Sequence, residues 1–114
     1  HQDWGRQMSI TLPKLPHPGM KVVYISGPMT GLPDLNFPAF HAAARMLRDL
    51  GHEVRNPAEV GNEPGKSWED YMRKDLRLLC DCTHIYLLPG WEKSKGAHLE
   101  LHIAHRLGME VMFA

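Results

Sequence analysis

Short apolar runs alternate with segments of helical periodicity along most of the chain. Four runs of β-branched and aromatic residues are bounded by turn residues, which predicts strands at 21–26, 52–55, 84–88 and 110–113. Between them apolar residues recur every three or four positions, which predicts helices at 36–50, 67–82 and 95–107. Gly51 and Gly108 end the first and last helices, and Ser67 with Asp70 forms a capping-box pattern at the start of the second.

Strands that alternate with helices predict one α/β fold. We expect a three-layer Rossmann- or flavodoxin-like arrangement, with a four-stranded, mostly parallel sheet and helices on both faces. Ligands in such folds bind beyond the carboxyl ends of the strands, where the strand order switches. The loops expected at that edge are 27–35, 56–66 and 89–95.

The first twenty residues follow neither pattern. They hold three prolines and no signal-peptide layout, so we expect a flexible leader at 1–20 and a single domain at 21–114. Met8 and Met20 are both candidates for the natural start. An alternative for 10–15 is an arm that lies on a partner subunit.

The composition excludes several classes of function. The chain has 114 residues, and 13 Lys+Arg balance 13 Asp+Glu, so it lacks the basic stripe of a polynucleotide-binding protein and the polybasic excess of a membrane-surface protein. No apolar run reaches the roughly 18 residues of a membrane span. Cys80 and Cys82 are too close in sequence to form a disulfide framework, and we interpret them as core or interface residues of a cytoplasmic protein.

Two carboxylates fall on or beside apolar helix faces. Glu100 lies at the border of the apolar stripe of the helix at 95–107, and Asp75 lies within the stripe of the preceding helix. Burying such a group unpaired costs several kcal/mol or shifts its pKa. The pair can divide acid and base roles. The alternative is that each caps a helix or pairs with a cation such as Arg73 or Arg77.

Two other features are weaker signals. A glycine-containing loop follows the first predicted strand, where backbone N–H groups can approach a ligand, although a simple turn explains it equally; it comprises Gly27, Pro28, Met29, Thr30 and Gly31. Trp91, in a loop at the ligand edge, either stacks on a base or closes the core or a subunit contact. We interpret Trp68 and Tyr71 as core and pocket wall.

Three histidines share one side of the last predicted helix. His98 and His102 have a spacing that can hold a metal, and His105 follows, but HLELH is not HExxH and no further ligand is identifiable. We therefore expect a solvated or subunit-facing helix side, and no metal or other cofactor.

Three sequence motifs together resemble one enzyme superfamily. VVYISGP at 22–28, YMRKDL at 71–76 and GAHLELHIAHRLG at 96–108 resemble the nucleoside 2-deoxyribosyltransferases. This superfamily includes transferases that exchange bases between deoxynucleosides and hydrolases that cleave deoxynucleoside monophosphates. The chain is most similar to a small phage and prophage group with the patterns GPMTG, NP(A/S)E and GWExSxGAxLE across 21–114.

The resemblance implies catalytic roles for three residues. The family's nucleophile is a Glu four residues after a Gly, a pattern that falls on Gly96 and Glu100. The family's base-handling Asp falls on Asp75, and the Tyr that holds the nucleophile falls on Tyr24. The carboxylates that stand out in the helix pattern are therefore the ones that the resemblance selects.

The resemblance also implies a substrate-binding set, in which the first loop lines the sugar or phosphate. With the ligand-edge residues it comprises Gly27, Pro28, Met29, Thr30, Gly31, Asn56, Trp91, Ser94 and Gly96. The chain departs from the family pattern at Ser94, near the place of a second Asp, and at His102, where a small residue is common. Because the sequence ends at Ala114, we expect no counterpart of the C-terminal residues that complete a neighbouring site in some relatives.

The predicted function is cleavage or transfer at the N-glycosidic bond of a 2-deoxyribonucleoside or its 5′-monophosphate, through a covalent bond between Glu100 and the sugar. The expected partners are a small nucleoside or nucleotide and further copies of the chain, with no polynucleotide and no membrane. One alternative is a catalytically inactive nucleotide-binding or regulatory module. Another is an interaction protein that forms an oligomer through its histidine face.

Overall fold

A computed structural model describes residues 19–61 and 63–114. Residues 1–18 of the predicted leader, with the proposed arm at 10–15, lie outside the described residues. In the described part, four strands form a single sheet: β1 (Val22–Ser26), β2 (Glu53–Arg55), β3 (His84–Leu87) and β4 (Glu110–Phe113). Three α-helices connect them: α2 (Phe37–Asp49), α3 (Trp68–Cys80) and α4 (Lys95–Arg106).

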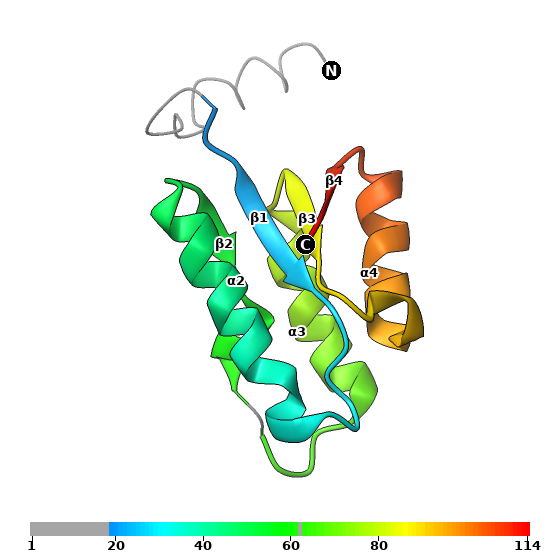
Figure 1. The fold of residues 1–114 in the computed structure, drawn as a ribbon. Helices are drawn as coiled ribbons and strands as arrows, with labels where there is room; N and C mark the ends of the chain where they lie inside the picture. Colours follow the sequence, from blue (N-terminus) through cyan, green and yellow to red (C-terminus); the bar gives the residue numbers. More distant parts are fainter. Residues whose placement is uncertain (1–18, 62) are drawn as a thin grey trace.

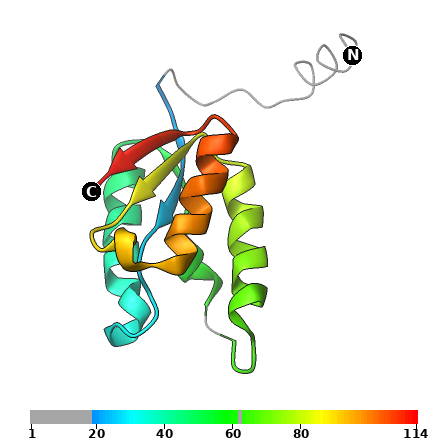
Figure 2. The ribbon, with the colours of Figure 1, turned by 90° about the vertical axis from the view of Figure 1, so that its right-hand side faces the viewer.

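The sheet has the order β2-β1-β3-β4, and every pairing is parallel. The predicted α/β class is thus confirmed, and the sheet expected to be mostly parallel is parallel throughout its described strands. Helix α2 covers one face of the sheet, while α3 and α4 cover the other (Figures 1 and 2). Because the chain leaves β1 toward β2 on one side and continues at β3 on the other, the switch in strand order lies between β1 and β3.

The alternation of side chains along β1 divides the core into two halves. Val23 and Ile25 pack in the cluster that includes α2, whereas Val22 and Tyr24 pack in the cluster that includes α3 and α4. A period of two residues is what a strand buried on both faces requires. It also places Ser26, the last residue of β1, on the same side of the sheet as Tyr24.

A serine caps the start of α3, as the sequence predicts, and another serine caps the start of α4. At the start of α3, Ser67 and Asp70 bond reciprocally to each other's backbone N–H as a capping box. At the start of α4, the Ser94 hydroxyl accepts a hydrogen bond from the backbone N–H of Ala97 at 3.1 Å. In the described ranges, short 3-10 helices form at Pro57–Val60 and Trp91–Lys93, within segments that sequence patterns predicted as loops. Pro33–Asn36, where the predicted loop 27–35 meets the predicted helix, forms a short turn whose backbone is not helical at Asp34 and Leu35.

The ends of β1 and β3 approach each other closely. A Cβ added at Gly27 would lie only 2.8 Å from the Cβ of Leu88, so this position accepts no side chain without a shift of the backbone. The loop after β1 therefore leaves the sheet along a path fixed by Leu88. No helix in the described ranges is long and apolar enough to cross a lipid bilayer.

Candidate active site

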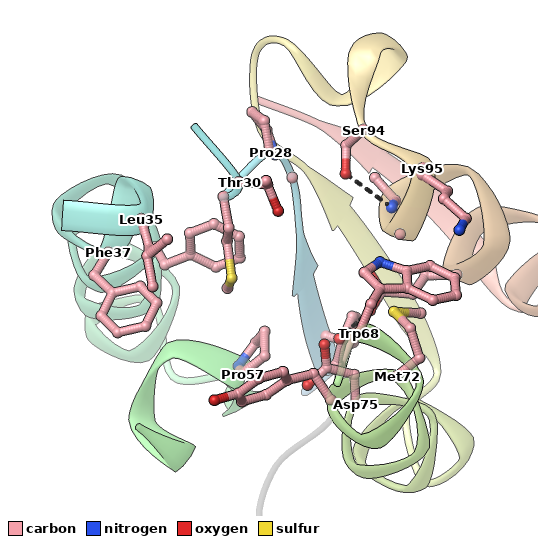
Figure 3. Close-up of a pocket in the computed structure, with 18 of the residues that line it drawn as sticks. Pro28, Thr30, Leu35, Phe37, Pro57, Trp68, Met72, Asp75, Ser94 and Lys95 are labelled. Carbon is pink, nitrogen blue, oxygen red and sulfur yellow. Dashed lines mark hydrogen bonds between the residues drawn. The ribbon is translucent and has the colours of Figure 1, made fainter. Parts of the chain in front are cut away.

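A cavity of about 600 Å³ opens at the carboxyl edge of the sheet, near the switch in strand order (Figure 3). The loop after β1 forms one side, and α3 with the start of α4 forms the other. Nine residues predicted for the site line this cavity: Tyr24, Gly27, Pro28, Met29, Thr30, Asp75, Ser94, Gly96 and Glu100. The fold thus brings together residues from β1, α3 and α4 that lie far apart in the sequence.

Glu100 is the buried carboxylate at the base of this cavity. Its side chain is on α4, and only 5% of the residue is exposed. The Tyr24 hydroxyl donates a hydrogen bond to Oε2 at 2.6 Å, and the Ser26 hydroxyl donates one to Oε1 at 2.6 Å. Each carboxylate oxygen therefore has one short hydroxyl donor from β1, an arrangement that stabilises the charged form and fixes its orientation.

Asp75 from α3 lines the same cavity, and its carboxyl group is electrostatically coupled to that of Glu100. Burial raises the pKa of both carboxyl groups, and hydrogen bonds from Ser26 and Tyr24 lower that of Glu100 in turn. Two neighbouring carboxyl groups that repel each other's charge hold a proton to higher pH than either would alone. The pair can therefore supply a negative charge and a proton at the same place, as acid–base chemistry requires.

Tyr24 is a neutral hydrogen-bond donor in this site. Burial raises the pKa of its phenol well above the usual value, and the charges of Glu100 and Asp75 raise that pKa further. The hydroxyl therefore keeps its proton across the physiological range and can donate it in a hydrogen bond to Glu100.

The cavity has two apolar walls and a polar region near the start of α4. Leu35 and Phe37 lie on one side, opposite Trp68 and Met72 on the other, so a flat apolar group fits between them (Figure 3). Near the start of α4 the lining is polar and basic: Lys93, Ser94 and Lys95. The Nζ of Lys95 lies 3.9 Å from the centre of the Trp68 ring, a cation–π contact that joins α4 to α3.

The loop after β1 reaches its side of the cavity through an unusual turn. Asp34, Leu35 and Asn36 all have positive φ, of 52°, 53° and 61°, a conformation that Asn and Asp adopt more readily than Leu. The Asn36 side chain donates a hydrogen bond to the carbonyl of Pro28 at 3.0 Å. This bond ties the two ends of the loop together and holds Leu35 against the cavity.

Three residues predicted for substrate binding do not line this cavity. Gly31 is exposed in the loop after β1. Asn56 is buried, and its side chain accepts from the backbone N–H of Ala58, so it caps the 3-10 helix whose first residue, Pro57, does line the cavity. Trp91 packs on the α3–α4 side of the core and contacts Phe113. Any direct contact of these three with a substrate stays a prediction.

The histidines of α4 lie away from the cavity. His98 donates from Nε2 to the carbonyl of Glu92 at 2.6 Å and contacts the Trp91 ring, while His102 and His105 are exposed. Among the described residues, no group of three or more His, Cys, Asp or Glu side chains is arranged to hold a metal ion.

Sequence reasoning missed Ser26, Phe37 and the two lysines. The signal for Ser26 was present, because it stands two residues after Tyr24 and a strand places both on one face. Trp68 and Tyr71, interpreted as core and pocket wall, do line the cavity. Phe37 and Lys93 carry no comparable signal, since only the folded loops bring them to the site.

Comparison with known proteins supports this fold and places the chain in a family. A solved structure of a 2-deoxyribosyltransferase from the psychrotolerant bacterium Bacillus psychrosaccharolyticus, described as a biocatalyst for nucleoside synthesis, superposes with a TM-score of 0.64. The match covers 81% of this chain and 70% of that chain at 23% identity, so it confirms the predicted fold resemblance. No curated protein matches. The sequence profile of the family described as Domain of unknown function (DUF4406) matches residues 21–113, and the chain therefore belongs to that family.

Proposed function

We propose that this protein breaks the N-glycosidic bond of a 2-deoxyribonucleoside or its 5′-monophosphate. The observation that carries the proposal is the pair formed by Glu100 and Asp75 in a cavity of about 600 Å³, with Tyr24 and Ser26 donating to Glu100. A buried, oriented carboxylate is suited to attack at carbon, and a neighbouring carboxyl group that retains a proton is suited to general acid catalysis. The 2-deoxyribosyltransferase named above has the same fold, which supports this choice of bond.

The first step forms a covalent intermediate. A Glu100 oxygen attacks C1′ of the sugar, and the bond between C1′ and the base nitrogen breaks with its electron pair on the base. Asp75, or a water that it orients, donates a proton to the departing base. The product is an ester between Glu100 and C1′, as in glycosidases that retain configuration. The scheme needs no metal, because Glu100 supplies the nucleophile and Asp75 the proton.

The second step releases the sugar. Water, or the nitrogen of a second base, attacks C1′ and loses a proton to Asp75, while the ester bond breaks and its electron pair returns to Glu100. Attack by water makes the protein a hydrolase, and attack by a base makes it a transferase. Both outcomes retain the configuration at C1′, because C1′ is inverted twice.

The lining of the cavity is compatible with the parts of such a substrate. The apolar walls that include Phe37 and Trp68 suit a flat base. Thr30 and Ser94 offer hydroxyls to the sugar. Lys93 and Lys95 also line the cavity, and their cations would favour a substrate that carries a 5′-phosphate.

The test is an assay of base release. Purified protein is incubated with each of the four deoxynucleosides and each monophosphate, and the free base is measured by chromatography. We expect turnover by the wild type, none above background by Glu100→Ala, and a loss of about 10²- to 10⁴-fold in kcat for Asp75→Asn. The absence of turnover with all eight compounds, or equal turnover by Glu100→Ala, would overturn the proposal.

A nucleotide-binding module without chemistry is the second candidate. It is favoured by Ser94, which stands near the place of a second Asp in the transferases that the sequence resembles and whose hydroxyl caps α4. This alternative predicts that monophosphates raise the melting temperature of both the wild type and Glu100→Gln, while neither releases a base.

A further inference from the structure

We propose that Ser26 is a positioning residue for Glu100, whose hydroxyl holds Oε1 so that the carboxylate keeps one orientation and its negative charge. This inference rests on the proposed function of Glu100 and adds a residue to it. The Ser26 hydroxyl donates to Oε1 at 2.6 Å, and only 1% of Ser26 is exposed. No water can therefore replace this donor without a change in the packing around it.

The two donors of Glu100 are matched in geometry and come from the same strand. Tyr24 and Ser26 stand two positions apart on β1, so both side chains point to the α4 side of the sheet. Each contacts a different oxygen of the carboxylate. With one donor, a carboxylate can rotate about its last bond, whereas donors on both oxygens leave it one orientation. Ser26 therefore supplies the second fixed point.

The surroundings of Glu100 offer little to replace the water that its carboxylate loses, so each hydrogen-bond donor is important. Titratable groups face it from two elements, Tyr24 on β1 and Asp75 on α3, while Ile85 and Leu87 on the adjacent β3 are apolar. The cations that line the cavity, Lys93 and Lys95, are exposed at its border. A carboxylate in such a place has lost its hydration, so charge-assisted hydrogen bonds must replace it.

The Ser26 hydroxyl also affects the ionisation of Glu100. Burial raises the pKa of Glu100, and the hydrogen bonds from Ser26 and Tyr24 oppose this effect because they favour the charged carboxylate. A donor to the charged form favours that form. Removing the Ser26 hydroxyl is therefore expected to raise the pKa of Glu100.

The test reads this ionisation directly and needs no turnover. In ¹³C-labelled protein the Glu100 carboxyl carbon is assigned by its absence in Glu100→Gln and titrated by NMR. We expect Ser26→Ala to raise the midpoint by about one pH unit, a tenfold change in the ionisation constant. Ser26→Thr keeps the hydroxyl and should keep the midpoint of the wild type. If Ser26→Ala does not fold, the second variant is Ser26→Cys, whose thiol is a weak donor of similar size.

Thr83→Ala is the matched control. The Thr83 hydroxyl bonds to the backbone of Val22 at the opposite end of β1, so its loss weakens the strand without touching Glu100. We expect no change of the Glu100 midpoint in this variant. An unchanged midpoint in both Ser26→Ala and Ser26→Cys, or an equal shift in Thr83→Ala, would overturn the role of Ser26.

Kinetics then separates this inference from the proposed function. If the wild type turns over a substrate, Ser26→Ala should lower kcat more than it changes KM, and the acidic limb of the rate profile should move to higher pH because Glu100 must be ionised to attack. If the wild type turns over nothing but the midpoint shifts as expected, the proposed reaction fails and the role of Ser26 in holding Glu100 stands.

Discussion

Glu100 loses nearly all of its contact with water when the chain folds, although it is a carboxylate. Its two oxygens recover part of that loss through the hydroxyls of Tyr24 and Ser26, and Asp75 stands close enough to compete for a proton. Residues with such perturbed ionisation are more common at functional sites than elsewhere, which is why this pair carries the proposed function. The same perturbation makes the stability of the protein depend on pH.

Replacing Glu100 by Gln should change stability in a pH-dependent way. Burial raises the pKa values of the coupled Asp75–Glu100 pair to about 6 and about 8, values that belong to the pair rather than to either carboxyl group, so the folded chain binds protons that the unfolded chain has released. The stability tied to these protons is complete below the unfolded values and is lost as pH rises toward 8. The stability of Glu100→Gln relative to the wild type should therefore increase between pH 5 and pH 8. Each kcal/mol in the free energy of unfolding corresponds to about 4–8 °C in melting temperature.

Melting curves at pH 5 and pH 8 measure the difference in melting temperature between Glu100→Gln and the wild type, which is called the gap below. Glu69→Gln, which replaces an exposed carboxylate of α3, is the control and should show the same gap from the wild type at both values. A gap for Glu100→Gln that stays constant with pH would contradict the prediction.

At the scale of the elements, the site depends on how closely the ends of β1 and β3 approach each other and how closely α4 approaches α3. Gly27, directly after β1, lies against Leu88, and Gly96, in the first turn of α4, lies beside Met72 on α3. Both positions lack a Cβ, but their neighbours differ. The root of the Leu88 side chain is fixed to its backbone, whereas the sulfur of Met72 is at the end of a flexible chain.

The two glycine-to-alanine variants should therefore behave differently. In Gly27→Ala the new Cβ would lie 2.8 Å from the Cβ of Leu88, and we expect a loss of about 1–3 kcal/mol in the free energy of unfolding. In Gly96→Ala the nearest atom is the Met72 sulfur at 3.2 Å, and alanine favours a helix over glycine by about 1 kcal/mol, so folding should be little affected. Because Gly96 lines the cavity, KM should rise in that variant.

Chemical denaturation of the two variants in parallel checks this contrast. Equal destabilisation by both substitutions would show that the approach of Gly27 to Leu88 does not limit the fold.

Periodicity predicted the elements well because it reflects burial. The helix predicted at 36–50 is observed at Phe37–Asp49, and the last strand is observed with the predicted bounds, Glu110–Phe113. The 3-10 helices were missed because three or four residues are too few to show a period. In the site, Glu100 and Asp75 stood out as polar residues on apolar faces. The strand pattern places Ser26 on the same face as Tyr24, but it does not predict the contact with Glu100, which lies 74 residues away and is brought to Ser26 only by the packing of α4 on β1.

Large apolar residues are exposed at several places in the described part of the molecule, and the edge strand β4 is one of them. There 65% of Phe113 is exposed, and Val111 on the same strand is exposed as well. A domain of this size has a limited core, and exposed apolar side chains on an edge strand suit a contact surface. The predicted homo-oligomer is therefore physically reasonable, and it stays a prediction.

Sedimentation of the purified protein tests that prediction. We expect a species larger than the monomer at pH 7.5. If the histidine side of α4 lies in the contact, a change of pH from 7.5 to 5.5 should weaken the contact. A monomer at both pH values, at concentrations of tens of micromolar, would contradict the prediction.

The hydroxyl–carboxylate contacts of Glu100 also bear on how the protein folds. They join β1, near the start of the described chain, to α4, near its end, across separations of 76 and 74 residues. Contacts between such distant segments form late, because the chain between them must first be ordered. The arrangement around Glu100 is therefore complete only when the whole domain has assembled, and a partly folded chain has no preformed site. Recovery of base release after denaturation would then report the last stage of folding, after the helices themselves have formed.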